Sequence, residues 1–197
     1  MKNILLCGVG GQGTVLASKL IAQAAMEKGM KAKSAETIGM AQRGGSVVSH
    51  VRFGQEIYSP LIPMGQADVI MAFEPGEAMR AIPYLKEGGS MIVCPDAILP
   101  VTASLGIGGY SGTKAVEYLK EHVKSLVLVD GTSICKECGS PKVLNVALLG
   151  AAAAGGMLGI TIEEMENAVM NRVPDKLKDM NRKALQLGAA SVSNMKR

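Results

Sequence analysis

The segment Gly8-Val9-Gly10-Gly11-Gln12-Gly13 has the G-x-G-x-x-G spacing and lies between an expected strand and an expected helix. Glycines in such a turn let the backbone approach a ligand closely, and the following helix presents free N–H groups to an anion. Glu36 closes the second expected strand, at about the distance where a dinucleotide fold places its ribose-binding acid. The spacing fits a dinucleotide site. It fits equally a tight turn that binds nothing, in which Glu36 accepts backbone N–H bonds.

A second glycine-bearing loop is expected over residues 37–45, with Gln42 and Arg43 among its glycines. In an open α/β fold such a loop brings polar groups to the carboxyl edge of the sheet, where ligands and partners bind. Arg43 offers a rigid fork of donors that suits a carboxylate or a phosphate. Its alternative roles are a surface salt bridge or a brace within the loop.

The two loops together resemble the γ component of the 2-oxoacid:ferredoxin oxidoreductase family. That family shows a Gly-Val-Gly-Gly-Gln-Gly start, a helix, and a strand leading to Arg-Gly-Gly. The run Ala-Glu-Thr-Ile-Gly-Met-Ala-Gln-Arg-Gly-Gly-Ser-Val-Val-Ser-His-Val-Arg, from Ala35 to Arg52, is similar to the β subunits of the indolepyruvate enzymes in particular. The later Asn145 to Gly150 also agrees, so the resemblance covers nearly the whole chain.

The resemblance implies a small enzyme subunit that is inactive alone. Members of the family oxidatively decarboxylate a 2-oxoacid with thiamine diphosphate, pass electrons through iron–sulfur clusters to ferredoxin, and release an acyl-coenzyme A. It further implies that a large α subunit holds the thiamine diphosphate, the Mg and the [4Fe-4S] clusters. The sequence agrees with this division, because it lacks the four well-spaced cysteines of a ferredoxin-type site. We expect this chain to bind no cofactor by itself.

We therefore expect both loops to face the α subunit near its active site and to contact coenzyme A or the substrate channel. No catalytic residue is assigned. The residues expected to face a ligand or the partner are Gly8, Gly10, Gly11, Gln12, Gly13, Glu36, Thr37, Gly39, Met40, Gln42, Arg43, Gly44 and Gly45.

Three alternatives remain open on the sequence. The chain can be the γ subunit of another enzyme of the family, acting on pyruvate, 2-oxoglutarate or 2-oxoisovalerate. It can be a stand-alone NAD(P)- or flavin-dependent enzyme built on the same glycine loop. It can also be a purely structural subunit with no ligand contact of its own.

Two further features have weaker chemical interpretations. Cys135-Lys136-Glu137-Cys138 looks like half of a zinc or redox site, but no second pair follows, so no metal site is assigned. His50 lies in an expected strand, where a lone histidine is more often packed or hydrogen-bonded than a base.

The alternation of elements predicts an α/β fold. Strands are expected over residues 2–7, 31–36, 46–53, 56–58, 69–73, 90–94 and 126–130, and helices over 13–28, 75–85, 113–123 and most of the remainder. Gly88-Gly89 is expected to end the unit made of the 69–73 strand and the 75–85 helix. Thr161 to Glu164 is expected to form a capping box, and Pro174 to separate the last two helices. We expect a three-layer α/β/α sandwich with a mostly parallel, mixed sheet, Rossmann-like at first and helical at the end. The 56–58 strand would form a hairpin with 46–53.

Composition narrows the class of protein. Residues 1–197 suit a single domain with one sizeable core, since 48% are hydrophobic. The net charge is +4, but the basic residues are scattered among acidic ones, and only 3% of residues are aromatic. This composition argues against a nucleic-acid-binding protein. We expect no secretory signal, no membrane span and a cytoplasmic location.

Overall fold

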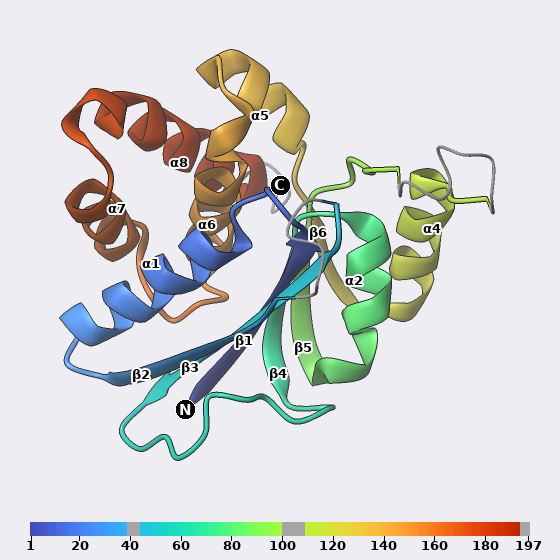
Figure 1. The fold of residues 1–197 in the computed structure, drawn as a ribbon, viewed down its shortest axis with the longest axis horizontal. Helices are drawn as coiled ribbons and strands as arrows, with labels where there is room; N and C mark the ends of the chain where they lie inside the picture. The colour runs from blue at the N-terminus through green and yellow to red at the C-terminus, as the bar shows by residue number, and fades with distance from the viewer. Residues whose placement is uncertain (39–43, 100–108, 194–197) are drawn as a thin grey trace.

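The computed structural model describes residues 1–38, 44–99 and 109–193. Its six strands form one sheet in the order β2-β3-β1-β4-β5-β6 (Figure 1). Strands β1, β4, β5 and β6 are parallel neighbours, and β3 runs antiparallel between β1 and β2. The strands are β1 (Lys2–Val9), β2 (Lys31–Ile38), β3 (Ser46–Gly54), β4 (Ala67–Ala72), β5 (Leu85–Val93) and β6 (Ser125–Leu128).

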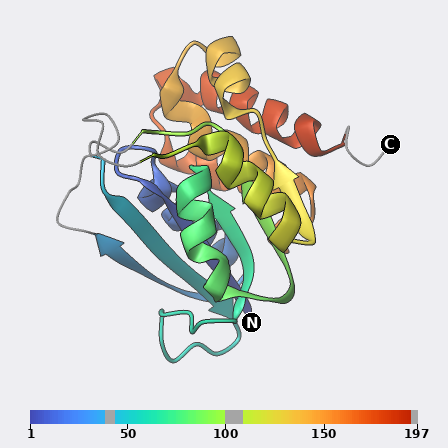
Figure 2. The same ribbon diagram turned by 90° about the vertical axis from the view of Figure 1, so that its right-hand side faces the viewer.

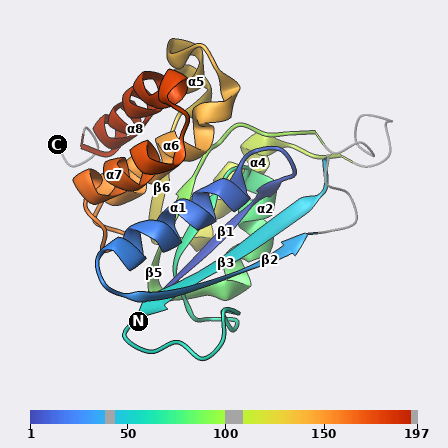
Figure 3. The same cartoon turned by 60° about the vertical axis from the view of Figure 1, so that its left-hand side comes forward.

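Helices cover both faces of the sheet, because successive side chains of the buried strands point to opposite sides. Ile4 and Leu6 face α1 and the late helices, whereas Leu5 and Cys7 face α2 and α4 (Figures 1, 2 and 3). The expected three-layer sandwich is confirmed. The helices are α1 (Thr14–Glu27), α2 (Pro75–Ala81), α4 (Gly112–His122), α5 (Gly131–Cys138), α6 (Leu144–Ala154), α7 (Ile162–Arg172) and α8 (Lys178–Ser193).

Helix α6 is the centre of the thicker helical layer. Its residues 145–153 are all buried, and α8 lies directly against it (Figure 3). Each helix has a glycine that faces the backbone of the other, Gly150 on α6 and Gly188 on α8. The small residues of the sequence therefore let two helices pack with their backbones touching.

The expected strand over residues 56–58 is absent, so the predicted hairpin is wrong. Both edges of β3 are already paired, one with β1 and one with β2, which leaves no side for a third strand. Residues 55–66 instead form a loop across the amino edge of the sheet. The Arg52 guanidinium holds this loop by donating to the carbonyls of Ser59 and Leu61 at 2.9 and 3.0 Å.

The expected end of the unit that contains the 75–85 helix is also misplaced. Helix α2 stops at Ala81, and a 3-10 turn over Ile82–Tyr84 follows, with Pro83 unable to donate a helical hydrogen bond. Gly88 and Gly89 lie inside β5, where the pairing with β4 shifts register between Ala67 and Val69. The two glycines therefore form an irregularity in a strand instead of ending a helix.

The late helices agree with the predictions made from the sequence. The capping box is confirmed, since the Thr161 hydroxyl accepts from the Glu164 N–H and the Glu164 carboxylate accepts from the Thr161 N–H. Pro174 does separate α7 from the 3-10 turn and helix that follow. Across residues 1–38, 44–99 and 109–193, no helix combines the length and apolarity needed to span a bilayer.

Candidate functional site

The two glycine-bearing loops meet at the carboxyl edge of the sheet. The antiparallel register pairs Val9, at the end of β1, with Ser46, at the start of β3. Beyond this pair, the Gly10 N–H donates to the Gly45 carbonyl at 2.9 Å. The described ends of both loops thus form one continuous backbone surface, here called the rim. Four predicted residues, Gly39, Met40, Gln42 and Arg43, lie outside the described residues.

Gln12 braces the rim from within. Its Oε1 accepts from the Val9 N–H at 2.7 Å, and its Nε2 donates to the Phe73 carbonyl at 2.8 Å. These backbone groups end β1 and β4, the neighbouring strands from which α1 and α2 leave toward opposite faces. Such a switch point is where open α/β sheets form a ligand crevice. One side chain therefore fixes the floor of that crevice.

Replacing Gln12 by alanine should lower the free energy of unfolding by about 2 kcal/mol, because two half-buried backbone groups lose their partner. Urea denaturation followed by circular dichroism measures the change. The matched control is Gln23→Ala, which removes only an exposed bond to Glu27 and should cost within about 0.5 kcal/mol. Equal losses in the two variants would contradict the bracing role.

Gly13 connects the rim to the buried helix α6. Its φ of 84° lies in the left-handed region, and a Cβ there would meet the Asn145 Nδ2 at 2.8 Å. Asn145, only 2% exposed, donates to the Gly13 carbonyl at 3.4 Å. The glycine is therefore required by both backbone conformation and space, and the late Asn145 segment has a direct contact with the loop.

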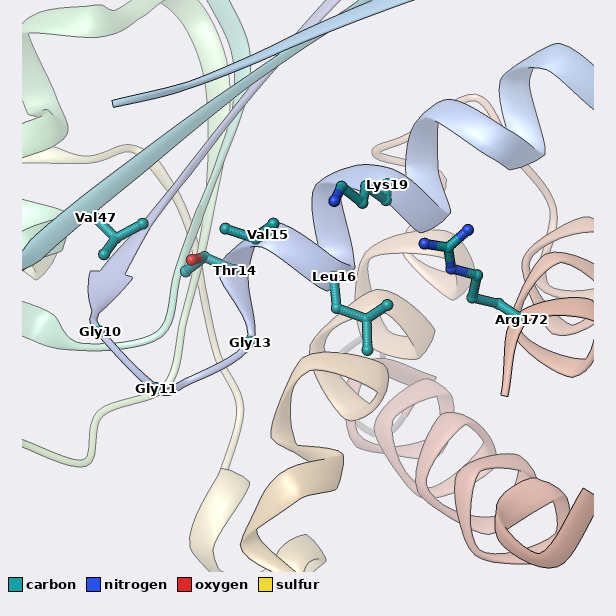
Figure 4. A pocket seen from close by; sticks show the side chains of 9 residues that line it. All are labelled: Gly10, Gly11, Gly13, Thr14, Val15, Leu16, Lys19, Val47 and Arg172. Carbon is teal, nitrogen blue, oxygen red and sulfur yellow. The ribbon is translucent and has the colours of Figure 1, made fainter. Parts of the chain in front are cut away.

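A cavity of about 480 Å³ opens on one side of the glycine loop. Gly10, Gly11, Gly13 and the first turns of α1 line it, together with Lys19 and Arg172 (Figure 4). Figure 4 shows Lys19 reaching back along α1 and the Arg172 guanidinium directed toward the same helix. Within the described part of the chain, neither cation forms an ion pair. Two unpaired positive charges and a helix amino end thus face one cavity, which suits a phosphate-bearing ligand.

A second cavity, of about 420 Å³, lies on the other side of the same loop. Its walls are mostly apolar, with Phe73, Cys94 and Cys135 among them. Asp96 is its acidic group, and it accepts from the Thr132 N–H and hydroxyl at 3.0 and 2.6 Å. Gly10 and Gly11 therefore form a wall shared by two cavities of different chemistry.

The half-site Cys135-Lys136-Glu137-Cys138 forms the end of α5, and both thiols are free and half-buried. Burial raises the pKa of both thiols, which disfavours the thiolate, the form that binds metals and reacts with oxidants. No group of three or more metal-ligating side chains occurs among the residues that the structure describes.

Glu36 and Thr37 lie on β2, one strand further from the glycine loop than a dinucleotide fold requires. Strand β3 separates β2 from β1, and Glu36 pairs with Ser49 of β3. Thr37 uses its hydroxyl to donate to the Val48 carbonyl at 3.0 Å. Neither arrangement reproduces the acid beside β1 that binds a ribose.

His50 is a packed strand residue. It is 5% exposed, its Nδ1 accepts from the Ile62 N–H at 3.2 Å, and Tyr84 lies edge-on to its ring. Burial lowers the pKa of His50, so the neutral ring is favoured. The histidine holds the 55–66 loop, far from the rim.

Sequence reasoning missed Lys19 and Arg172. Lys19 follows the loop by less than two turns of the helix, so its position could have been found from helical spacing. Arg172 reaches the cavity from the end of α7, and nothing in its local sequence indicates this.

Several known proteins are similar to this chain over most of its length. The indolepyruvate oxidoreductase subunit IorB of Pyrococcus horikoshii is 36% identical over 98% of this chain and 96% of its own length. The pyruvate/ketoisovalerate oxidoreductases common subunit gamma of Pyrococcus abyssi is 30% identical, covering 93% of each. The keto/oxoacid ferredoxin oxidoreductase gamma subunit of Geobacter sulfurreducens has a solved structure with a TM-score of 0.73 and 26% identity, covering 98% of this chain and 99% of that one.

The resemblance carried by the two loops is thus confirmed along nearly the whole sequence. Since residues 3–191 also match the family described as pyruvate ferredoxin/flavodoxin oxidoreductase, the chain belongs to that family.

Proposed function

We propose that this chain is the small subunit of an enzyme that oxidatively decarboxylates arylpyruvates, indolepyruvate above all, and reduces ferredoxin. The similarity to an indolepyruvate oxidoreductase subunit over almost the full length of both proteins supports this assignment. The large partner subunit would hold thiamine diphosphate, Mg and the [4Fe-4S] clusters. In this proposal the whole chain acts as one domain, and no residue of the rim is catalytic.

The rim would face the large subunit and contribute to the coenzyme A site. The observation that carries this proposal is the 2.9 Å bond between Gly10 and Gly45, which joins the two loops beside a cavity that Lys19 and Arg172 line. Coenzyme A carries several phosphate oxygens, and the loop N–H groups, Lys19 and Arg172 offer complementary donors. The expected contact of Arg43 with the ligand or the partner belongs to the same proposal, although Arg43 lies outside the described residues.

The test is reconstitution of the complex. The chain is co-expressed with its large subunit, and ferredoxin reduction is measured with indolepyruvate, phenylpyruvate, pyruvate and 2-oxoglutarate. We expect coenzyme A-dependent turnover that is fastest with an arylpyruvate, and none from either subunit alone. Micromolar binding of NAD, NADP or FAD by the isolated chain, without such turnover, would instead support a stand-alone nucleotide enzyme.

The second candidate is the γ subunit of a pyruvate or branched-chain 2-oxoacid enzyme. The 30% identity to a pyruvate/ketoisovalerate subunit favours it over unrelated functions. Faster turnover with pyruvate than with indolepyruvate in the same assay would select this candidate.

A further inference from the structure

Two buried carboxylates lie directly behind the rim. Glu74 and Glu77, at the start of α2, are 2% and 5% exposed. Glu74 caps the helix, since its Oε2 accepts from the Glu77 N–H at 2.9 Å. Burying a carboxylate is costly unless hydrogen bonds compensate for the lost water. The partners of these two groups therefore indicate what the burial achieves.

Glu77 is bonded to the segment that returns from the second loop. The Ser46 hydroxyl donates to one of its carboxylate oxygens, and the Arg80 guanidinium donates to the other. Ser46 directly follows Gly45, whose carbonyl accepts from the Gly10 N–H. One carboxylate thus anchors the junction of the two glycine-bearing loops to α2.

Glu74 is bonded to a different returning segment. Its Oε1 accepts from the Tyr110 hydroxyl, and the oxygen of that hydroxyl accepts from the Gly76 N–H at 3.0 Å. Burial, and then the bond to Glu74, raise the pKa of Tyr110, so this hydroxyl keeps its proton and remains a donor. Gly76 leaves the space that the ring occupies, since a Cβ there would lie 3.0 Å from the Tyr110 hydroxyl.

Both anchored segments border one small cavity of about 210 Å³. Gly44 and Ser46 line it from one side, Tyr110 from another, and the two glutamates from α2. Because Glu77 also donates its own N–H to Glu74, the two anchors are linked to each other. The two returning segments are therefore joined by one chain of hydrogen bonds through the start of α2.

We propose that Glu77 and Glu74 are positioning residues that hold the returning segments 44–46 and 109–111 in one fixed arrangement at the rim. This inference rests on the proposed function, in which the rim contributes to the coenzyme A site. The two glutamates do not touch the ligand in this scheme. They set the geometry of the backbone groups that do.

The test uses the reconstituted complex and two variants that remove a single hydroxyl each, Ser46→Ala and Tyr110→Phe. Each should raise the KM for coenzyme A about tenfold, with kcat changed less than about twofold, because a displacement near 1 Å in a binding surface has effects of this order or larger. Ser46→Thr keeps a hydroxyl and should restore the KM. The control Ser90→Ala removes a hydroxyl pair between β5 and β6, away from the rim, and should leave both constants unchanged.

Hydrogen exchange of the isolated chain separates this inference from the proposed function. Ser46→Ala should speed amide exchange at 109–111 as well as at 44–46. Tyr110→Phe should likewise speed exchange at 44–46 as well as at 109–111. A complex with no coenzyme A-dependent activity would refute the proposed function, and the exchange data would then decide the coupling alone. The inference is overturned if each variant loosens only its own segment, or if the KM for coenzyme A stays within twofold of the wild type.

Discussion

Replacing Gly188 by alanine is expected to destabilise the chain by about 3 kcal/mol or more, since overpacking against rigid backbone lies at the high end of core substitutions. A Cβ at Gly188 would lie 1.9 Å from the Ala147 carbonyl oxygen, and one at Gly150 would lie 2.0 Å from that of Leu185. Neither oxygen can move without shifting its helix. Separating α8 from α6 would in turn expose a helix that is buried along nearly its whole length.

The measurement is the free energy of unfolding from urea denaturation. Gly109→Ala is the matched control, because a Cβ there would meet nothing within 4 Å. The double variant Gly150→Ala/Gly188→Ala should lose less than the sum of the single losses, since the first clash already parts the helices. A loss below about 1 kcal/mol for Gly188→Ala would show that α8 adjusts without cost and would contradict the rigid contact.

Reversing both cavity charges, Lys19→Glu with Arg172→Glu, is expected to raise the KM for coenzyme A about 100-fold in the reconstituted complex. Each replacement turns an attraction for phosphate into a repulsion, and about 1.4 kcal/mol for each site corresponds to a factor of ten. The wild-type KM should rise with ionic strength, because exposed charges are screened by salt. In the double variant the dependence should reverse, because salt then screens a repulsion and lowers the KM.

The control is Lys31→Glu, an exposed lysine at the start of β2 and therefore at the opposite, amino edge of the sheet. This substitution changes the net charge as much as each cavity substitution does, but it should leave the KM for coenzyme A unchanged. Size-exclusion chromatography reports whether each variant still assembles with the large subunit. Loss of assembly with an unchanged KM in the remaining complex would assign the cavity to the partner interface instead of coenzyme A.

The sequence predicted the local elements well, because glycine spacing and apolar periodicity are local signals. The turn after β1, the capping box at Thr161 and the helical end of the chain all follow from neighbouring residues. The position of β3 could not be predicted in this way. Its alternating pattern is the same whichever strands flank it, so the hairpin with residues 56–58 looked as plausible as the observed pairing with β1 and β2.

In the candidate site, too, contacts between distant parts of the chain could not be predicted from local sequence patterns. Gln12 was predicted as part of the rim, but its bond to Phe73 crosses 61 positions and depends on β4 lying beside β1. Arg172 and Tyr110 also reach the rim from distant parts of the chain. The role of the glycine loops in binding stays a prediction, whereas their meeting at Gly10 and Gly45 is a property of the fold.

The insertion of β3 beside β1 explains why a chain with a dinucleotide fingerprint need not be a nucleotide enzyme. In a dinucleotide fold the strand next to β1 carries the acid for the adenosine ribose. Here the antiparallel strand β3 occupies that place. Instead of an acid, it brings Gly45 into contact with Gly10 of the glycine loop. The reversed strand thus removes the place from which a dinucleotide fold presents its ribose-binding acid, so genome-wide searches that count glycines alone would misassign this loop as a dinucleotide site.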